Sequence, residues 1–171
     1  MRFFYSIISI LALTFITSCG DSNSEIVYRT CNELVKKESE ELYLVIDPIH
    51  LMDKDKPEIG IIIMPWREST TTKISIDPIG FEACPEDLTS ALFIFDDKTR
   101  VMLNHSSQTG CEWNFEHHFY SEKELNAFIK KEVKIIRFTS GGKTVTNFLT
   151  DQAKTDLLTV MNCISLDQMS D

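Results

Sequence analysis

The chain has 171 residues and a formal net charge of −9, because 26 acidic side chains outnumber 17 lysines and arginines. This length suits one ordinary domain with a core of its own. The acidic balance argues against nucleic acid and against anionic lipid headgroups as partners, since both attract clustered positive charge.

Residues 1–18 have the three-part layout of a secretory signal peptide: a charged start at Arg2, an apolar run from Ile7 to Thr17, and small residues before a cleavage site. The apolar run is about half of the roughly 20 residues that span a bilayer, so a transmembrane helix is the weaker interpretation. The last residues of this segment, Ile16-Thr17-Ser18-Cys19, resemble the lipobox of bacterial lipoproteins.

The lipobox resemblance implies that the Cys19 thiol receives a diacylglyceryl group, that the chain is cut before it, and that the new amine is acylated. Two or more acyl chains make a durable membrane anchor, whereas a single chain binds only marginally. Residues 19–25 then predict a flexible tether before a single domain over residues 26–171. We expect a cell-envelope protein, with the outer membrane favoured; a periplasm-facing and a surface-exposed position both stay open.

Four cysteines follow the lipidation site, and an even number in an exported chain indicates disulfides. Of the three possible pairings we favour Cys31–Cys163, which joins the start of the fold to its last helix, and Cys84–Cys111, which flanks a central hairpin. Four free thiols are the alternative. No pair has the CxxC spacing of a zinc site, so neither a metal nor another cofactor is predicted.

Apolar runs of strand length, separated by turn residues, fill most of the domain. Residues 26–41 predict either a short helix or an irregular segment. Between the strands at 91–95 and 100–104, Asp96-Asp97-Lys98-Thr99 indicates a hairpin. The other runs of this kind lie at 42–46, 59–64, 70–77 and 112–120, and the alternation in 70–77 predicts one face toward solvent.

Helical patterns come late in the chain. Ser121 to Glu124 has the capping-box pattern and opens a helix, and Thr150 or Asp151 caps a second helix at the end. Between them, strands at 133–139 and 143–149 are joined through two glycines. The sequence therefore predicts an α+β domain: a mainly antiparallel sheet of about seven or eight short strands, with two late helices packed on one face.

No catalytic motif is present. His117 and His118 are neighbours on a predicted strand, so they point to opposite faces and cannot share a metal ion. We expect His117 in the core and His118 beside Glu116 at the surface. The best candidates for a partner-binding surface are Trp66, Arg67 and Trp113, because tryptophan and arginine are enriched at binding hot spots. The alternative is structural, with Trp113 in the core and Trp66 half-buried at a strand end.

Residues 93–137 resemble small exported lipoproteins of unknown function from Bacteroidota-type bacteria. The resemblance rests on an F-x-F hairpin strand, a cysteine before an aromatic strand, and S-x-x-E-L opening a helix that leads into I-I-R-F. It implies no activity. The leading hypothesis is a lipid-anchored envelope module that binds a protein or a glycan; the alternatives are an envelope hydrolase that uses carboxylates or His118, and a structural or inhibitory lipoprotein.

Overall fold

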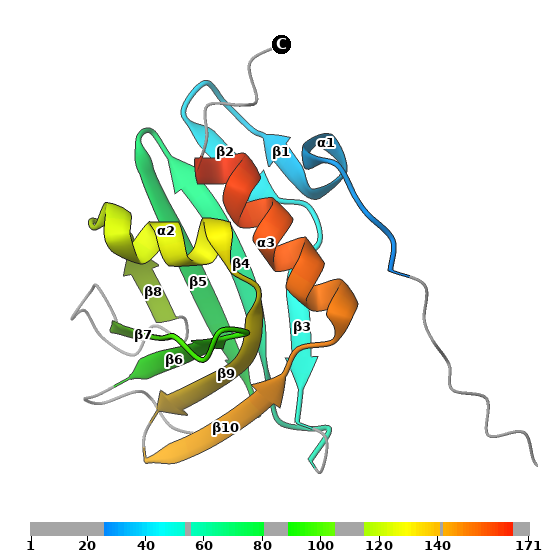
Figure 1. Cartoon of the computed structure of the whole chain (residues 1–171), viewed down its shortest axis with the longest axis vertical. Helices are drawn as coiled ribbons and strands as arrows, with labels where there is room; N and C mark the ends of the chain where they lie inside the picture. Colours follow the sequence, from blue (N-terminus) through cyan, green and yellow to red (C-terminus); the bar gives the residue numbers. More distant parts are fainter. Residues whose placement is uncertain (1–25, 54–55, 81–88, 105–114, 141, 166–171) are drawn as a thin grey trace, which may run out of the picture.

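The computed structural model describes residues 26–53, 56–80, 89–104, 115–140 and 142–165. This part of the chain forms ten strands in two antiparallel sheets and three helices, two of them late in the chain (Figure 1). The expected α+β class and the antiparallel pairing are therefore confirmed.

The larger sheet has six strands: β1 (Val35–Lys37), β2 (Leu42–Val45), β3 (Ile49–Met52), β4 (Gly60–Glu68), β5 (Thr71–Ile79) and β8 (Phe115–His118). Its order is β1-β2-β4-β5-β8, and β3 also pairs with β4. The smaller sheet has the order β10-β9-β6-β7, formed by β6 (Ser90–Phe95), β7 (Arg100–Asn104), β9 (Val133–Ser140) and β10 (Lys143–Phe148). The helices are α1 (Cys31–Leu34), α2 (Glu122–Lys130) and α3 (Asp151–Ser165).

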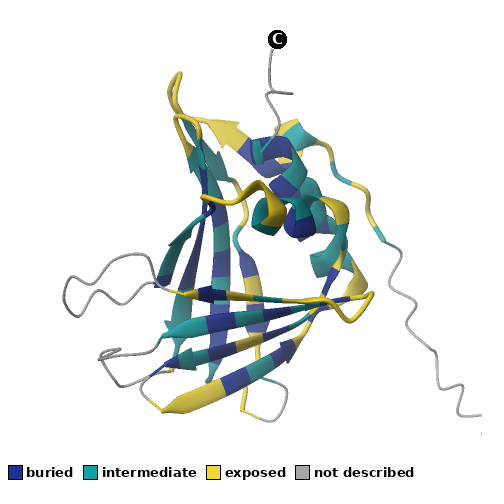
Figure 2. Cartoon of the chain, turned by 60° about the vertical axis from the view of Figure 1, so that its left-hand side comes forward, coloured by how far each residue is buried: buried dark blue, intermediate teal, exposed yellow. Residues whose placement is uncertain are grey.

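The β4–β5 hairpin contributes the two longest strands of the larger sheet. Its two nine-residue strands pair from Gly60↔Ile79 to Glu68↔Thr71. Side chains alternate between the two faces of a strand, so Ile61 and Ile74 share one face, where both are fully buried. Figure 2 shows this alternation of buried residues along the strands. We call the face that carries these isoleucines the inner face, and the opposite one the outer face.

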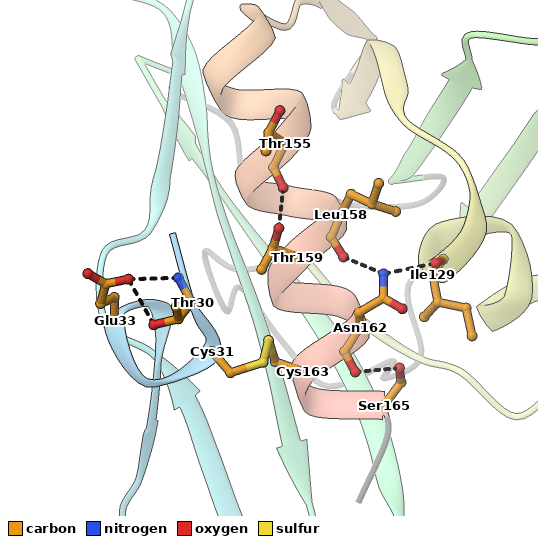
Figure 3. Close-up of a disulfide and its surroundings, with 10 residues drawn as sticks. All are labelled: Thr30, Cys31, Glu33, Ile129, Thr155, Leu158, Thr159, Asn162, Cys163 and Ser165. Atoms are coloured by element: carbon orange, nitrogen blue, oxygen red, sulfur yellow. Dashed lines mark hydrogen bonds between the residues drawn. A yellow bond between two sulfur atoms is a disulfide. The ribbon is translucent and has the colours of Figure 1, made fainter. Parts of the chain in front are cut away.

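Helix α2 packs against the smaller sheet through Phe128. The Phe128 ring lies edge-on to Phe93, Phe95 and Phe119, with centroid distances of 4.9, 5.3 and 5.1 Å. Edge-to-face pairs of this kind add about 0.5–1.5 kcal/mol beyond their buried area. Helix α3 packs beside α2, where the Asn162 side-chain amide donates to the Ile129 carbonyl at 2.9 Å (Figure 3).

Two side-chain hydrogen bonds join the sheets at their edges. The Asn147 amide on β10 donates to the Leu51 carbonyl on β3 at 2.8 Å. On the other side, His117 Nδ1 on β8 lies 2.8 Å from the Asn104 carbonyl on β7. Because a carbonyl oxygen only accepts, Nδ1 carries the hydrogen. The larger and smaller sheets are thus joined through β3 and β10 on one side and through β8 and β7 on the other.

Two details of this fold differ from the expectation. The described residues form ten strands in two sheets, because β1 and β3 have no strand pattern that the sequence reveals and because non-local pairing separates the sheets. The Ser121 hydroxyl makes no cap hydrogen bond to α2. The Glu124 carboxylate, which the capping box would return to the helix start, lies 3.1 Å from His117 Nε2. A Thr–Glu pair does stabilise α1, where the Glu33 carboxylate accepts from the Thr30 amide at 2.7 Å.

Candidate functional site

Three side chains on the outer face form a row across three strands. The strand registers pair Trp66 with Lys73, and Lys73 with His118. Directly opposed residues project from the same face of a sheet, and their side chains touch. The next row pairs Ser75 with Glu116, and the Trp66 indole donates to the Ser75 hydroxyl at 3.0 Å. We call Trp66, Glu68, Lys73, Glu116 and His118 the outer-face cluster.

Lys73 is the centre of this cluster. Its side chain is only 11% exposed, and its ammonium lies 2.7 Å from Glu68 and 3.9 Å from Glu116. The same ammonium lies 4.1 Å from the centroid of the Trp66 ring, within cation–π range. The hydrogen bond from Lys73 holds the pKa of Glu68 below its ordinary value. The lysine is therefore fixed in place by an aromatic ring and carboxylates.

His118 extends the cluster toward solvent. Its Nε2 contacts the Glu116 carboxylate, and its Nδ1 lies 2.7 Å from the Tyr120 hydroxyl. The His118 and Glu116 side chains are 22% and 28% exposed, whereas Tyr120 is 81% exposed. Together with Tyr120, the cluster extends from a nearly buried ammonium to a strongly exposed phenol, and it offers a ligand both hydrogen-bond donors and acceptors.

Asp77 lies on the outer face as well, two positions beyond Ser75 on β5. Within the described residues its Oδ1 atom is buried without a hydrogen-bond partner. Burial raises the pKa of this carboxyl above its ordinary value. The face predicted to be solvated in 70–77 is therefore partly covered, since Lys73 and Ser75 are only 8% and 6% exposed.

Trp66 and Arg67, two of the three candidates for a partner-binding surface, project from opposite faces of the sheet. Arg67 points to the inner side, where its guanidinium lies 5.7 Å from the Tyr43 ring centroid and 3.5 Å from the Ile164 carbonyl in the last turn of α3. A cation at this end of a helix is favourable because the last carbonyls carry partial negative charge. The geometry assigns Arg67 to helix packing and leaves Trp66 on the candidate surface.

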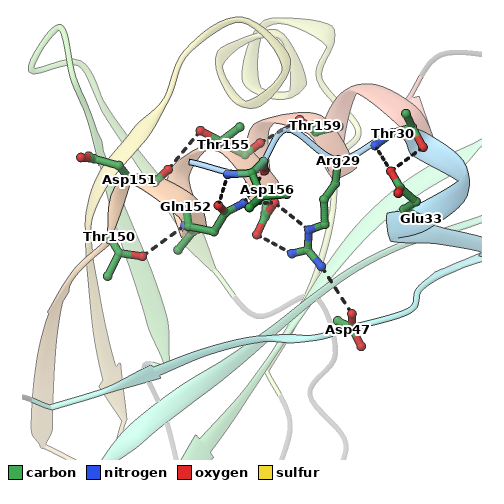
Figure 4. Close-up of polar contacts among 12 residues, drawn as sticks. Arg29, Thr30, Glu33, Asp47, Thr150, Asp151, Gln152, Thr155, Asp156 and Thr159 are labelled. Carbon is green, nitrogen blue, oxygen red and sulfur yellow. Dashed lines mark hydrogen bonds and ion pairs between the residues drawn. The ribbon is translucent and has the colours of Figure 1, made fainter. Parts of the chain in front are cut away.

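The start of the domain lies along α3. Cys31 and Cys163 form a disulfide, with Cα atoms 5.5 Å apart, which is the pairing favoured from the sequence (Figure 3). Upstream, the Arg29 guanidinium bonds to the Asp156 carboxylate and also reaches Asp47 at 3.4 Å (Figure 4). These contacts fix the point at which the expected tether joins the fold.

Several predicted site residues lie outside the described residues: Cys19, Cys84, Cys111 and Trp113. In the described ranges, no cluster of His, Cys, Asp or Glu has the arrangement of a metal site. Nor does any helix of those ranges combine the length and the apolar character of a membrane span.

Comparison with known proteins gives no match: no family model, no curated sequence and no solved structure is significantly similar to this chain.

Proposed function

We propose that this is a lipid-anchored envelope protein whose single domain binds a partner, either a protein or a glycan, through the outer face of its larger sheet. The observation that carries the proposal is the cross-strand row of Trp66, Lys73 and His118. An indole, an ammonium, carboxylates and an imidazole meet there in one ordered cluster. Binding surfaces favour such preorganised polar groups beside an aromatic ring, because little side-chain entropy is lost on association.

The anchor in this proposal is an acylated Cys19, and two features are consistent with it. The disulfide between Cys31 and Cys163 suits an oxidising compartment outside the cytoplasm. Arg29, close to the start of the described residues, bonds to Asp156 of α3, so the proposed tether would lead into a segment that is held against a helix of the domain. A short tether on a rigid body keeps the binding face close to the membrane, where envelope partners are concentrated.

The chemistry of the partner follows from the cluster. Glu116 and Glu68 accept hydrogen bonds, and the Tyr120 hydroxyl both donates and accepts. A ligand rich in hydroxyl or amide groups satisfies this set, as glycans and polar protein surfaces do. Nucleic acid does not fit this set of groups, because the cluster holds more carboxylates than fixed cations and the whole chain is acidic.

A photo-crosslinking amino acid at Tyr120 tests this surface in intact cells. Phe148 on β10 is the matched control position, because it is also aromatic and strongly exposed, at 71% compared with 81%. We expect a specific adduct from position 120 and none of that mass from position 148. Digestion with proteases or with glycan hydrolases then distinguishes the two classes of partner. The same adduct from both positions would contradict the proposal.

A hydrolase is the second candidate, favoured by the contact between Glu116 and His118. A carboxylate that orients a histidine is part of many general-base arrangements. Here, however, His118 Nε2 contacts the carboxylate and Nδ1 contacts Tyr120, so both ring nitrogens have partners. Neither nitrogen remains to take a proton from a nucleophile in this geometry. If the protein turned over a cell-wall substrate and His118→Gln abolished this turnover, the hydrolase would become the leading candidate.

A further inference from the structure

Strand β7 lies at the edge of the smaller sheet. In the described part of the chain it pairs with β6 alone. The Phe95 amide donates to the Thr99 carbonyl at 2.9 Å, so these two residues form a hydrogen-bonded pair at the turn end of the hairpin. Hydrogen-bonded and non-hydrogen-bonded pairs alternate along antiparallel strands. The backbone amides and carbonyls of Arg100, Met102 and Asn104 therefore point away from β6. The Asn104 carbonyl confirms this direction, because it accepts from His117 outside the sheet.

The open edge of β7 forms one wall of a groove, and helix α2 forms the other. The groove has a volume of about 640 Å³ and includes Arg100, Met102, Lys123, Asn126, Lys130 and Lys131. Met102 is 51% exposed. An edge strand beside a helix has the geometry in which an extended peptide adds as a further strand, with backbone hydrogen bonds for affinity and pockets for alternate side chains.

The groove is basic although the chain is acidic. Four of its side chains are cations, and only Lys131 has an ion-pair partner among the described residues, with Asp97 at 2.7 Å. The carboxylate that lines the groove, Glu124, is directed to His117. Arg100, Lys123 and Lys130 therefore present positive charge that no described carboxylate balances. Charge complementarity of this kind selects an acidic partner.

We infer that this groove binds an extended acidic segment of another protein, which adds as a strand to β7. The backbone groups of Arg100 and Met102 pair with the segment, and its carboxylates on the α2 side meet Lys123 and Lys130. The site is separate from the outer-face cluster and does not depend on the proposed anchor or on the partner of that cluster. It would give the domain a second, sequence-tolerant interaction with acidic unstructured chains.

The test uses the mature protein purified from its own cells and a fluorescein-labelled peptide, acetyl-Val-Glu-Val-Asp-Val-Glu-amide. Fluorescence anisotropy measures its Kd. We expect binding to weaken at least about tenfold when alternate amides of the peptide are N-methylated, because those amides no longer donate to β7. Replacement of the acidic residues of the peptide by lysine should have an effect of similar size.

Variants of the protein locate the site. Met102→Pro removes one outward amide, and proline is tolerated at a sheet edge, so the variant should keep its fold and lose the peptide. Lys123→Glu with Lys130→Glu should weaken binding about tenfold or more. The matched control is Lys134→Glu with Lys143→Glu, since both side chains are exposed on the same sheet but away from the groove. That control should bind as the unaltered protein does.

Three results would overturn the inference. Equal binding of the N-methylated peptide would show anion attraction without strand addition. An equal loss of peptide affinity in the groove variant and in the control variant would show a nonspecific charge effect. A dimer in sedimentation that dissociates in Met102→Pro would identify a second copy of this chain as the occupant. If Met102→Pro does not fold, the N-methylated peptide still decides between strand addition and charge alone.

Discussion

The Arg29 guanidinium bonds to the Asp156 carboxylate across 127 residues of chain, with Nε 3.1 Å from Oδ1. The Asp156 side chain is only 7% exposed, so this is an ion pair at the edge of the core. The hydrogen bond to Asp156 raises the pKa of Arg29 above its ordinary value. Val27 and Cys31, on either side, contact Gln152 and Cys163 of the same helix. The start of the domain therefore runs parallel to α3.

Removal of the Arg29 side chain should destabilise the fold more than removal of a surface cation. Arg29→Ala leaves the Asp156 carboxylate buried without its cation, and we expect the free energy of unfolding to fall by about 2–3 kcal/mol. The control is Lys36→Ala, whose 62% exposed side chain pairs with Glu38 and should contribute less than about 1 kcal/mol. Urea unfolding measures both, and equal values would contradict the structural role of Arg29.

The disulfide should be the strongest single constraint on the unfolded chain. It joins residues separated by 132 positions, for which the loop-entropy model gives roughly 5 kcal/mol. We expect Cys31→Ala with Cys163→Ala to lower the free energy of unfolding by about 3–5 kcal/mol. The unaltered protein in reductant should approach the variant. No difference between oxidised and reduced protein would mean that the bond contributes nothing to stability.

The two late helices should respond differently to loss of the residue at their start. The Thr150 hydroxyl accepts from the Ala153 amide at 3.2 Å, so Thr150→Ala should cost about 1 kcal/mol. Ser121 makes no such bond, and Ser121→Ala should change stability by less than about 0.5 kcal/mol. Thermal unfolding of the two variants side by side gives the comparison. Equal losses would show that Ser121 caps α2 in solution.

Asp77 should make the protein less stable as the pH rises. Its pKa is raised in the fold by burial, so the protonated form is favoured there, and its contribution to stability is lost as the pH rises through the folded pKa. Asp77→Asn removes the charge, and we expect a gain of up to about 1 kcal/mol at neutral pH. The gain should shrink at low pH. A variant that is less stable at neutral pH would show that the carboxylate is paired.

Local patterns predicted most of the elements but not how they assemble. Alternating or continuous apolar runs gave β4, β5 and the β6–β7 hairpin, and the period of the last segment gave α3. β3 was missed because a four-residue alternation after Asp47-Pro48 resembles a turn. The pairing of β6 with β9 depends on contacts between residues such as Phe93 and Ile136, which no local pattern reveals.

In the candidate site, too, local spacing could be predicted from the sequence but the contacts between strands could not. The adjacency of Glu116 and His118 follows from their i, i+2 spacing on one strand. Their position beside Lys73 and Trp66 depends on two strand registers, and a lysine in an alternating strand is expected to point to solvent. The orientation of Arg67 could not be predicted either: its residue type is typical of binding sites, whereas its place in the strand register directs it toward α3.

The mass of the mature protein from the native membrane fraction tests the anchored-module account most directly. We expect a chain that begins at Cys19 and carries the added mass of a diacylglyceryl group and an N-terminal acyl chain. We also expect Cys19→Ala to leave the precursor uncut and to release the domain from membranes. An intact Met1 without added acyl mass would contradict the anchor, the compartment and the proposed partner together.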